Sequence, residues 1–138
     1  MGIRRIVVGF DGSETSYRAF AMAIGLAGRE HGVVHAGFVA HLPATADPGG
    51  FVAPASLIFD PEGDDELASF VTAELARTGV AGDFTRRSGD VAAELERLAE
   101  ACGADLLVVG RSTHPHLHLG GVPRQLLARG RMPVLVVP

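Results

Sequence analysis

The chain has 138 residues and a formal net charge of −4, and apolar residues make up 47% of it. This length fits one domain, the acidic balance argues against nucleic acid or anionic lipid as a partner, and no apolar run reaches the roughly 18 residues of a membrane helix. No signal-peptide pattern precedes the first apolar run, and the single cysteine, Cys102, cannot form an internal disulfide. We therefore expect a cytoplasmic protein without nucleic-acid or membrane partners. All 12 basic residues are arginine, which excludes mechanisms that require a lysine.

Apolar runs alternate with segments of helical periodicity along the chain. In chain order, this pattern predicts a strand over residues 3–10, a helix over 14–31, a strand over 33–39, a helix over 64–78, a strand over 80–87, a helix over 91–102, a strand over 105–109, a short helix over 122–129 and a strand over 133–137. Ser13 is the expected N-cap of the first helix, and Gly32 is expected to end it.

The predicted strands are nearly continuous apolar runs, which is typical of strands buried on both faces. This alternation predicts one α/β domain over residues 1–138, with a five-stranded parallel sheet and helices on both faces. The expected strand order is 3-2-1-4-5, with the switch point between the first and fourth strands. Ligands bind at the carboxyl ends of such strands. The candidate segments are therefore residues 9–13 (GFDGS) and 110–113 (GRST).

Each candidate in these segments also has a purely structural interpretation. Asp11 could contact a ligand or cap the following turn. Gly110 could form a tight turn and still border a pocket, and Ser13 could cap a helix as well as contact a phosphate. Arg111 could clamp a phosphate or remain a solvated surface residue.

Three histidines alternate in the sequence HPHLH at 114–118. In an extended loop, His114, His116 and His118 would point to one side, as a Zn²⁺, Ni²⁺ or Cu²⁺ site requires. No cysteine or carboxylate in that loop completes such a site, so we expect none. A solvent-exposed loop and a pH-sensitive loop are the alternatives. Cys102 is interpreted as a small core residue.

The segment over residues 40–63 lacks a clear period and contains four prolines beside an apolar cluster. A structureless loop of this length is unusual inside a compact domain. Two interpretations stay open: a mobile surface loop, or an apolar cluster that covers the edge of the sheet or contacts a partner.

Three parts of the chain, taken in order, resemble the universal stress protein family. They are VGFDGS at 8–13, the run from Gly89 through the helix at 91–102 to ADLLVVG at 104–110, and PVLVV at 133–137. The resemblance covers the chain apart from the long second loop. It implies an adenine nucleotide alpha hydrolase-like fold and a homodimer in which the C-terminal strands of two copies meet.

Many family members bind ATP through a signature after the fourth strand: Gly, two residues, Gly, nine residues, Gly, then Ser or Thr. Gly110 matches the first glycine, and Thr113 stands where the second belongs. Gly120, Gly121 and Val122 resemble the end of the signature, with glycine in place of the hydroxyl residue. The loop is three residues short, and Pro123 removes one N–H donor from the following helix.

The nucleoside side of the family site is better kept. Asp11 matches the acid that contacts the nucleoside, and Val39 matches a residue that lines the adenine pocket. The resemblance thus implies a stress-response domain that binds ATP or AMP with weakened phosphate recognition. It requires no metal, and no motif supports catalysis such as slow ATP hydrolysis. The expected nucleotide-binding residues are Gly9, Phe10, Asp11, Ser13, Val39, Gly110, Arg111, Thr113, Gly120, Gly121 and Val122.

The sequence does not fit two related α/β architectures, and one alternative function within the family stays open. A response-regulator receiver needs an acidic pair after the first strand and a lysine, and both are missing. A dinucleotide-binding domain needs G-x-G-x-x-G, which GFDG does not fit. The alternative function within the family is a nucleotide-free dimeric interaction scaffold.

Overall fold

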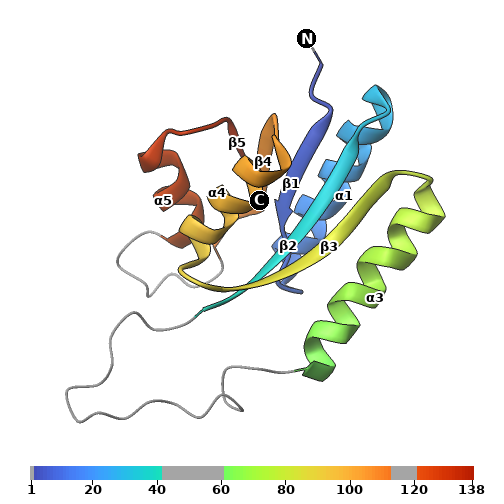
Figure 1. Cartoon of the computed structure of the whole chain (residues 1–138), viewed down its shortest axis with the longest axis horizontal. Helices are drawn as coiled ribbons and strands as arrows, with labels where there is room; N and C mark the ends of the chain where they lie inside the picture. The colour runs from blue at the N-terminus through green and yellow to red at the C-terminus, as the bar shows by residue number, and fades with distance from the viewer. Residues whose placement is uncertain (1, 42–60, 113–120) are drawn as a thin grey trace.

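A computed structural model of the chain describes residues 2–41, 61–112 and 121–138 (Figure 1). Strands and helices alternate through these residues. The elements are β1 (Arg5–Gly9), α1 (Glu14–Glu30), β2 (Val33–His41), α3 (Pro61–Thr78), β3 (Ala81–Gly89), α4 (Val91–Cys102), β4 (Leu106–Gly110), α5 (Gly121–Arg129) and β5 (Val134–Val137).

The five strands form one parallel sheet in the order β3-β2-β1-β4-β5. This confirms the predicted fold, including the switch point between β1 and β4. In β1, Val7 lies opposite His35 of β2 on one side and Leu107 of β4 on the other. Strands β1 and β4 are interior strands, and their apolar residues at 6–8 and 106–109 are buried on both faces of the sheet.

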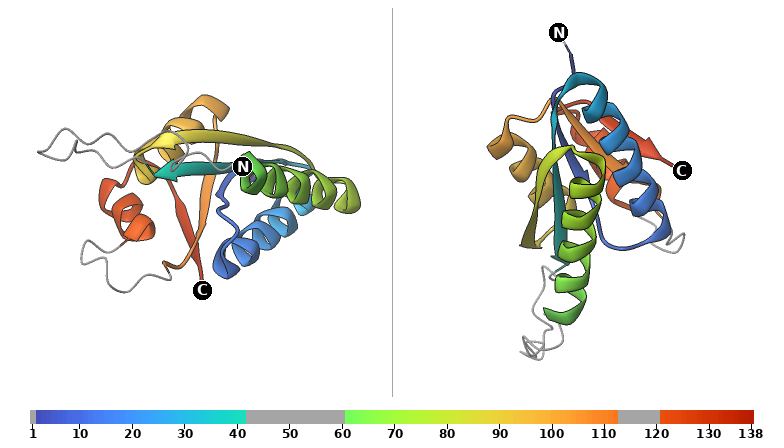
Figure 2. Two further views of the ribbon diagram at one scale, coloured as in Figure 1. Left: turned by 90° about the horizontal axis from the view of Figure 1, so that it is seen from below. Right: turned by 90° about the vertical axis from the view of Figure 1, so that its right-hand side faces the viewer.

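Helices lie on both faces of the sheet (Figure 2), and a hydrophobic layer fills the space under each pair of helices. On one face, Ile6 and Val8 pack with α1 and α3, around an aromatic group that includes Phe10 and Phe20. On the other face, Val7 packs with α4 and α5, where Leu95 and Leu126 are buried. Alternate residues of β1 therefore serve opposite layers, as the period of a strand dictates.

Element ends differ from the sequence prediction at several places. Helix α1 ends at Glu30, and the expected helical residue His31 adopts a left-handed conformation (φ 51°) as its C-cap. The N–H of Gly32 donates to the carbonyl of Ala27 at 2.8 Å, so Gly32 completes the cap from one position further on. Strand β2 continues to His41 and α3 begins at Pro61, which shortens the unassigned segment from both sides. Residues 42–60 lie outside the described residues, so neither interpretation of that segment is tested.

Candidate functional site

A cavity of about 490 Å³ opens at the carboxyl ends of the strands, over the switch point. The ends of β1, β2 and β4 and the first turns of α1, α4 and α5 form its wall. It brings together nine of the predicted residues: Gly9, Phe10, Asp11, Ser13, Val39, Gly110, Arg111, Gly121 and Val122. Thr113 and Gly120 lie outside the described residues.

At the switch point, the first turn of α1 contacts the residues at and just after the end of β4. The Thr15 hydroxyl donates to the carbonyl of Arg111 at 2.9 Å, and Thr15 is buried. A Cβ at Gly110 would lie 2.6 Å from the carbonyl carbon and the hydroxyl oxygen of Thr15. Only glycine at position 110 lets the first turn of α1 approach β4 this closely. Gly110 therefore shapes the cavity wall through its backbone.

Asp11 lies at the exposed end of β1, where its carboxylate organises the turn into α1. The backbone N–H of Ser13 donates to Oδ1 of Asp11 at 2.9 Å. The Ser13 side chain in turn caps α1 by accepting from the N–H of Ser16 at 3.3 Å. Partial burial raises the pKa of Asp11, but hydrogen bonds from Ser13 and Ser16 outweigh it and leave the pKa below its ordinary value. Asp11 is thus ionised at neutral pH. The hydrogen bonds also confirm that Asp11 caps the turn and that Ser13 is the N-cap of α1.

Two apolar residues of the predicted set have distinct places. Val39 is buried near the end of β2 and lines the cavity. Phe10 also borders the cavity, but its ring is 1% exposed and stacks on Phe70 with centroids 5.7 Å apart. An edge contact with Tyr17 at 5.0 Å completes its packing. Phe10 is therefore a core residue whose ring packs against both α1 and α3.

The side of the cavity where the resemblance places the phosphates has an unusual backbone. Gly121 has φ +64°, and a Cβ there would lie 2.8 Å from both Cβ and Oγ of Ser112. The Ser112 side chain thus occupies the space beside Gly121, and it lines the cavity. Arg111 is exposed beside it. Pro123, also in the wall, has no N–H to offer an anion.

Sequence reasoning missed several lining residues. Thr15 looked like an ordinary helix residue, and no local signal marks its contact with β4. Ser112 lies in the candidate segment 110–113 but is not among the predicted binding residues. Asp90 precedes an apolar helix, which is a recognisable N-cap signal: its Oδ2 accepts from the N–H of Ala93 at 3.0 Å. His41 joins the wall because β2 is longer than expected.

The described residues contain no cluster of three or more His, Cys, Asp or Glu side chains that could hold a metal. The three histidines at 114–118 lie outside this part of the chain, so the expectation for that loop stays a prediction. Burial and the charge of Asp83 raise the pKa of Cys102, so it is a protonated thiol packed against the α4 layer. Within the same residues, no helix combines the length and apolar character needed to cross a membrane.

The model of the universal stress protein family matches residues 2–138. The chain belongs to the universal stress protein family. The family predicted from the sequence is therefore confirmed. No match was found among curated protein sequences.

Solved structures of universal stress proteins share this fold. One from Burkholderia pseudomallei is 32% identical, with a TM-score of 0.76 over 99% of this chain and 96% of that chain. A universal stress protein in complex with cAMP is 24% identical, with a TM-score of 0.72 over 100% of this chain and 99% of that one. An Arabidopsis thaliana family member with AMP bound is 16% identical, with a TM-score of 0.69 over 97% and 90% of the two chains.

Proposed function

We propose that this universal stress protein domain binds an adenine nucleotide in the cavity at the carboxyl edge, with nucleoside recognition retained and phosphate recognition weakened. The observation that carries the proposal is the convergence of Asp11 and Val39 with Gly110 and Gly121 on one cavity. Its volume of about 490 Å³ suits a small molecule. Family members described with cAMP and with AMP bound support the ligand class.

The local geometry of the phosphate side supports weakened phosphate recognition. The left-handed backbone at Gly121 and the contact with Ser112 leave no room for a side chain at position 121. The polar side chains that remain on this side are Ser112, with a hydroxyl, and Arg111, with a positive charge. Losing one or two charge-assisted phosphate contacts, at about 1.5–3 kcal/mol each, weakens binding by one to several orders of magnitude. The additional phosphates of ATP should then give it no clear advantage in affinity over AMP.

We further propose that binding is not followed by catalytic turnover. Two of the cavity hydroxyls already donate to backbone carbonyls: Thr15 donates to the Arg111 carbonyl, and Ser16 donates to the Ser13 carbonyl at 2.8 Å. A hydroxyl held in this way is a poor nucleophile, since activation requires an adjacent general base. Incubation with ATP should yield no ADP above a protein-free control.

Titration calorimetry with adenosine, AMP and ATP tests the binding proposal. Asp11→Ala should weaken all three ligands, whereas Asp65→Ala, an exposed position on α3 away from the cavity wall, should change none. Ser112→Ala should weaken AMP and ATP about 3–10-fold, the value of one neutral hydrogen bond, and spare adenosine. Tight ATP binding, strongly preferred over AMP, would refute the weakened-phosphate proposal. Mass spectrometry of protein purified without added ligand should detect AMP or ATP.

A second candidate function is a nucleotide-free dimeric scaffold of cytoplasmic stress responses, and the edge strand provides the pairing surface that such a scaffold needs. Strand β5 ends the sheet, and Val134, Leu135 and Val136 are only half-buried. An apolar edge with unpaired backbone groups invites pairing with another chain. We propose that two copies pair through β5 in either case. Binding of neither AMP nor adenosine at millimolar concentration would favour the scaffold.

A further inference from the structure

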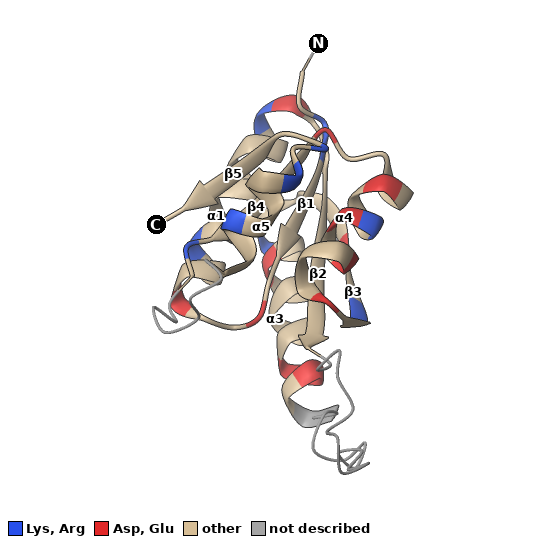
Figure 3. Ribbon diagram, turned by 90° about the vertical axis from the view of Figure 1, so that its left-hand side faces the viewer, with Lys and Arg blue, Asp and Glu red and all other residues tan. Residues whose placement is uncertain are grey.

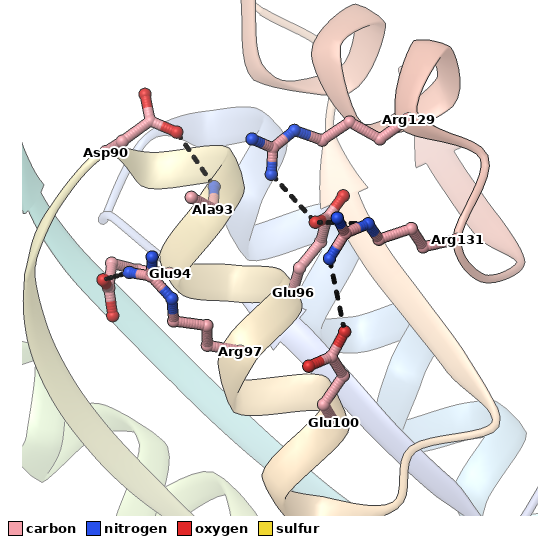
Figure 4. Close-up of polar contacts among 8 residues, drawn as sticks. All are labelled: Asp90, Ala93, Glu94, Glu96, Arg97, Glu100, Arg129 and Arg131. Carbon is pink, nitrogen blue, oxygen red and sulfur yellow. Dashed lines mark hydrogen bonds and ion pairs between the residues drawn. The ribbon is translucent and has the colours of Figure 1, made fainter.

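The acidic residues of α4 differ in how their charges are compensated. Every glutamate of this helix pairs with arginine (Figure 4). The pairs are Glu94 with Arg97 and, at 3.6 Å, with Arg87; Glu96 with Arg129 at 2.9 Å; and Glu100 with Arg131 at 3.7 Å. Each of these arginines is therefore already paired with a glutamate of α4.

Asp90, the N-cap of the same helix, has no such partner among the described residues. Its Oδ2 accepts only the N–H of Ala93 at 3.0 Å, which fixes the carboxylate at the start of α4 (Figure 4). Asp90 lines the cavity. Its exposed carboxylate thus carries a negative charge at the cavity wall and forms no ion pair with an arginine among the described residues.

The charges that line the described part of the cavity sum to a negative value. Asp11 and Asp90 contribute two carboxylates, and Arg111 contributes the one guanidinium there. His41 also lines the cavity. In the view of Figure 3, basic and acidic positions both occur along α1 and α4 among the described residues.

We propose that Asp90 is a specificity-determining residue that restricts the ligand to an adenine nucleoside or a nucleotide with a single phosphate. The inference rests on the proposed nucleotide site. A fixed carboxylate repels each negative charge of the ligand, and a triphosphate carries about twice the charge of a monophosphate. The N-cap carboxylate also cancels the partial positive charge of the α4 N-terminus, which would otherwise attract a phosphate.

Asp90→Asn tests this proposal without breaking the cap, because asparagine caps helices as well as aspartate. Titration calorimetry would use adenosine, AMP and ATP in EDTA, so that no divalent cation masks the phosphate charge. Wild type should bind AMP more tightly than ATP. Asp90→Asn should tighten ATP about fivefold and AMP about twofold, and leave adenosine unchanged, as expected for the loss of a solvent-screened repulsion that grows with the charge of the ligand.

Glu30→Gln is the matched control. It removes the same charge at the exposed last residue of α1, about 25 Å along the helix from the turn that lines the cavity. It should leave all three affinities unchanged, which separates a local effect from one of net charge. Asp90→Ser, which also retains a capping oxygen, repeats the test if circular dichroism shows that Asp90→Asn is unfolded.

The outcomes are distinguishable. If wild type binds adenosine but the ATP:AMP affinity ratio is the same in wild type and the folded Asp90 variant, the specificity role is wrong and the proposed function stands. A wild-type preference for ATP over AMP would overturn the role as well. If wild type binds none of the three ligands, both the proposed function and the role of Asp90 fall.

Discussion

The Glu96–Arg129 pair should be the ion pair whose loss destabilises the fold most clearly. Glu96 is 3% exposed on α4, and its Oε2 lies 2.9 Å from Nη1 of Arg129 at the end of α5 (Figure 4). Arg131 approaches the same oxygen only to 3.9 Å. Arg129→Ala therefore leaves a buried carboxylate with one distant partner. A charge-assisted hydrogen bond contributes about 1.5–3 kcal/mol, and solvent screening of Arg129, whose side chain is 41% exposed, lowers the expected loss to about 1–2 kcal/mol.

Thermal and urea unfolding measure this loss. At about 2.1 cal/mol/K of unfolding entropy per residue, 1–2 kcal/mol corresponds to a Tm decrease of about 3–7 °C for a chain of 138 residues. Arg18→Ala, which breaks the exposed i,i+4 pair with Glu14, is the control and should lose less than about 0.5 kcal/mol. Equal losses in the two variants would refute the reasoning. So would a coupling energy below about 0.5 kcal/mol in a double-mutant cycle with Glu96→Gln.

Three further predictions concern assembly, acid stability and the histidine loop. Val136→Arg, at the half-buried edge strand, should convert a homodimer into monomers or insoluble protein, and a monomeric wild type by light scattering at high concentration would contradict the dimer. The pKa of Asp105 is lowered by backbone N–H groups of Arg5 and Arg4, so its contribution to stability is complete at neutral pH and is lost as the pH falls through that lowered pKa. The difference in unfolding free energy between wild type and Asp105→Asn should therefore shrink from pH 5 to strongly acidic pH, and a constant difference would show that the carboxylate charge does not matter. Calorimetry with Zn²⁺ and Ni²⁺ should show only weak binding that His116→Ala barely changes; sub-micromolar binding abolished by that substitution would show a metal site in the loop.

The fold followed from the sequence because its signals are local and repeated. Continuous apolar runs such as LLVVG can be buried only in a strand covered on both sides, and α/β alternation then limits the topology to a few arrangements. Element ends were less predictable, since tertiary contacts set them. Strand β1 begins at Arg5, where Asp105, distant in sequence, accepts the backbone N–H groups of Arg4 and Arg5.

The candidate site was predicted where one short segment supplies both the turn and the side chain. Asp11 and Ser13 are of this kind: the hydrogen bond between them spans two residues. Thr15 and Asp90 are different, because Thr15 becomes part of the site through a contact with β4 and Asp90 through the placement of α4 beside the cavity. Their chemistry was visible in the sequence, but their position relative to the ligand space depends on packing between elements distant in the chain.

The Ser112 side chain occupies the space that a side chain at position 121 would need, and a comparison of motifs alone does not reveal this. By position, the chain has lost the hydroxyl residue of the family signature, and Gly121→Ser looks like the natural repair. A serine there would adopt φ +64°, which costs about 1–2 kcal/mol for a residue with a Cβ, and its Cβ would lie 2.8 Å from the Ser112 side chain. Ser112 already fills this space and lines the cavity, so under the proposed function the hydroxyl comes from a residue before the loop rather than after it. The close approach of Ser112 to Gly121 therefore leaves no place for a second side chain at position 121.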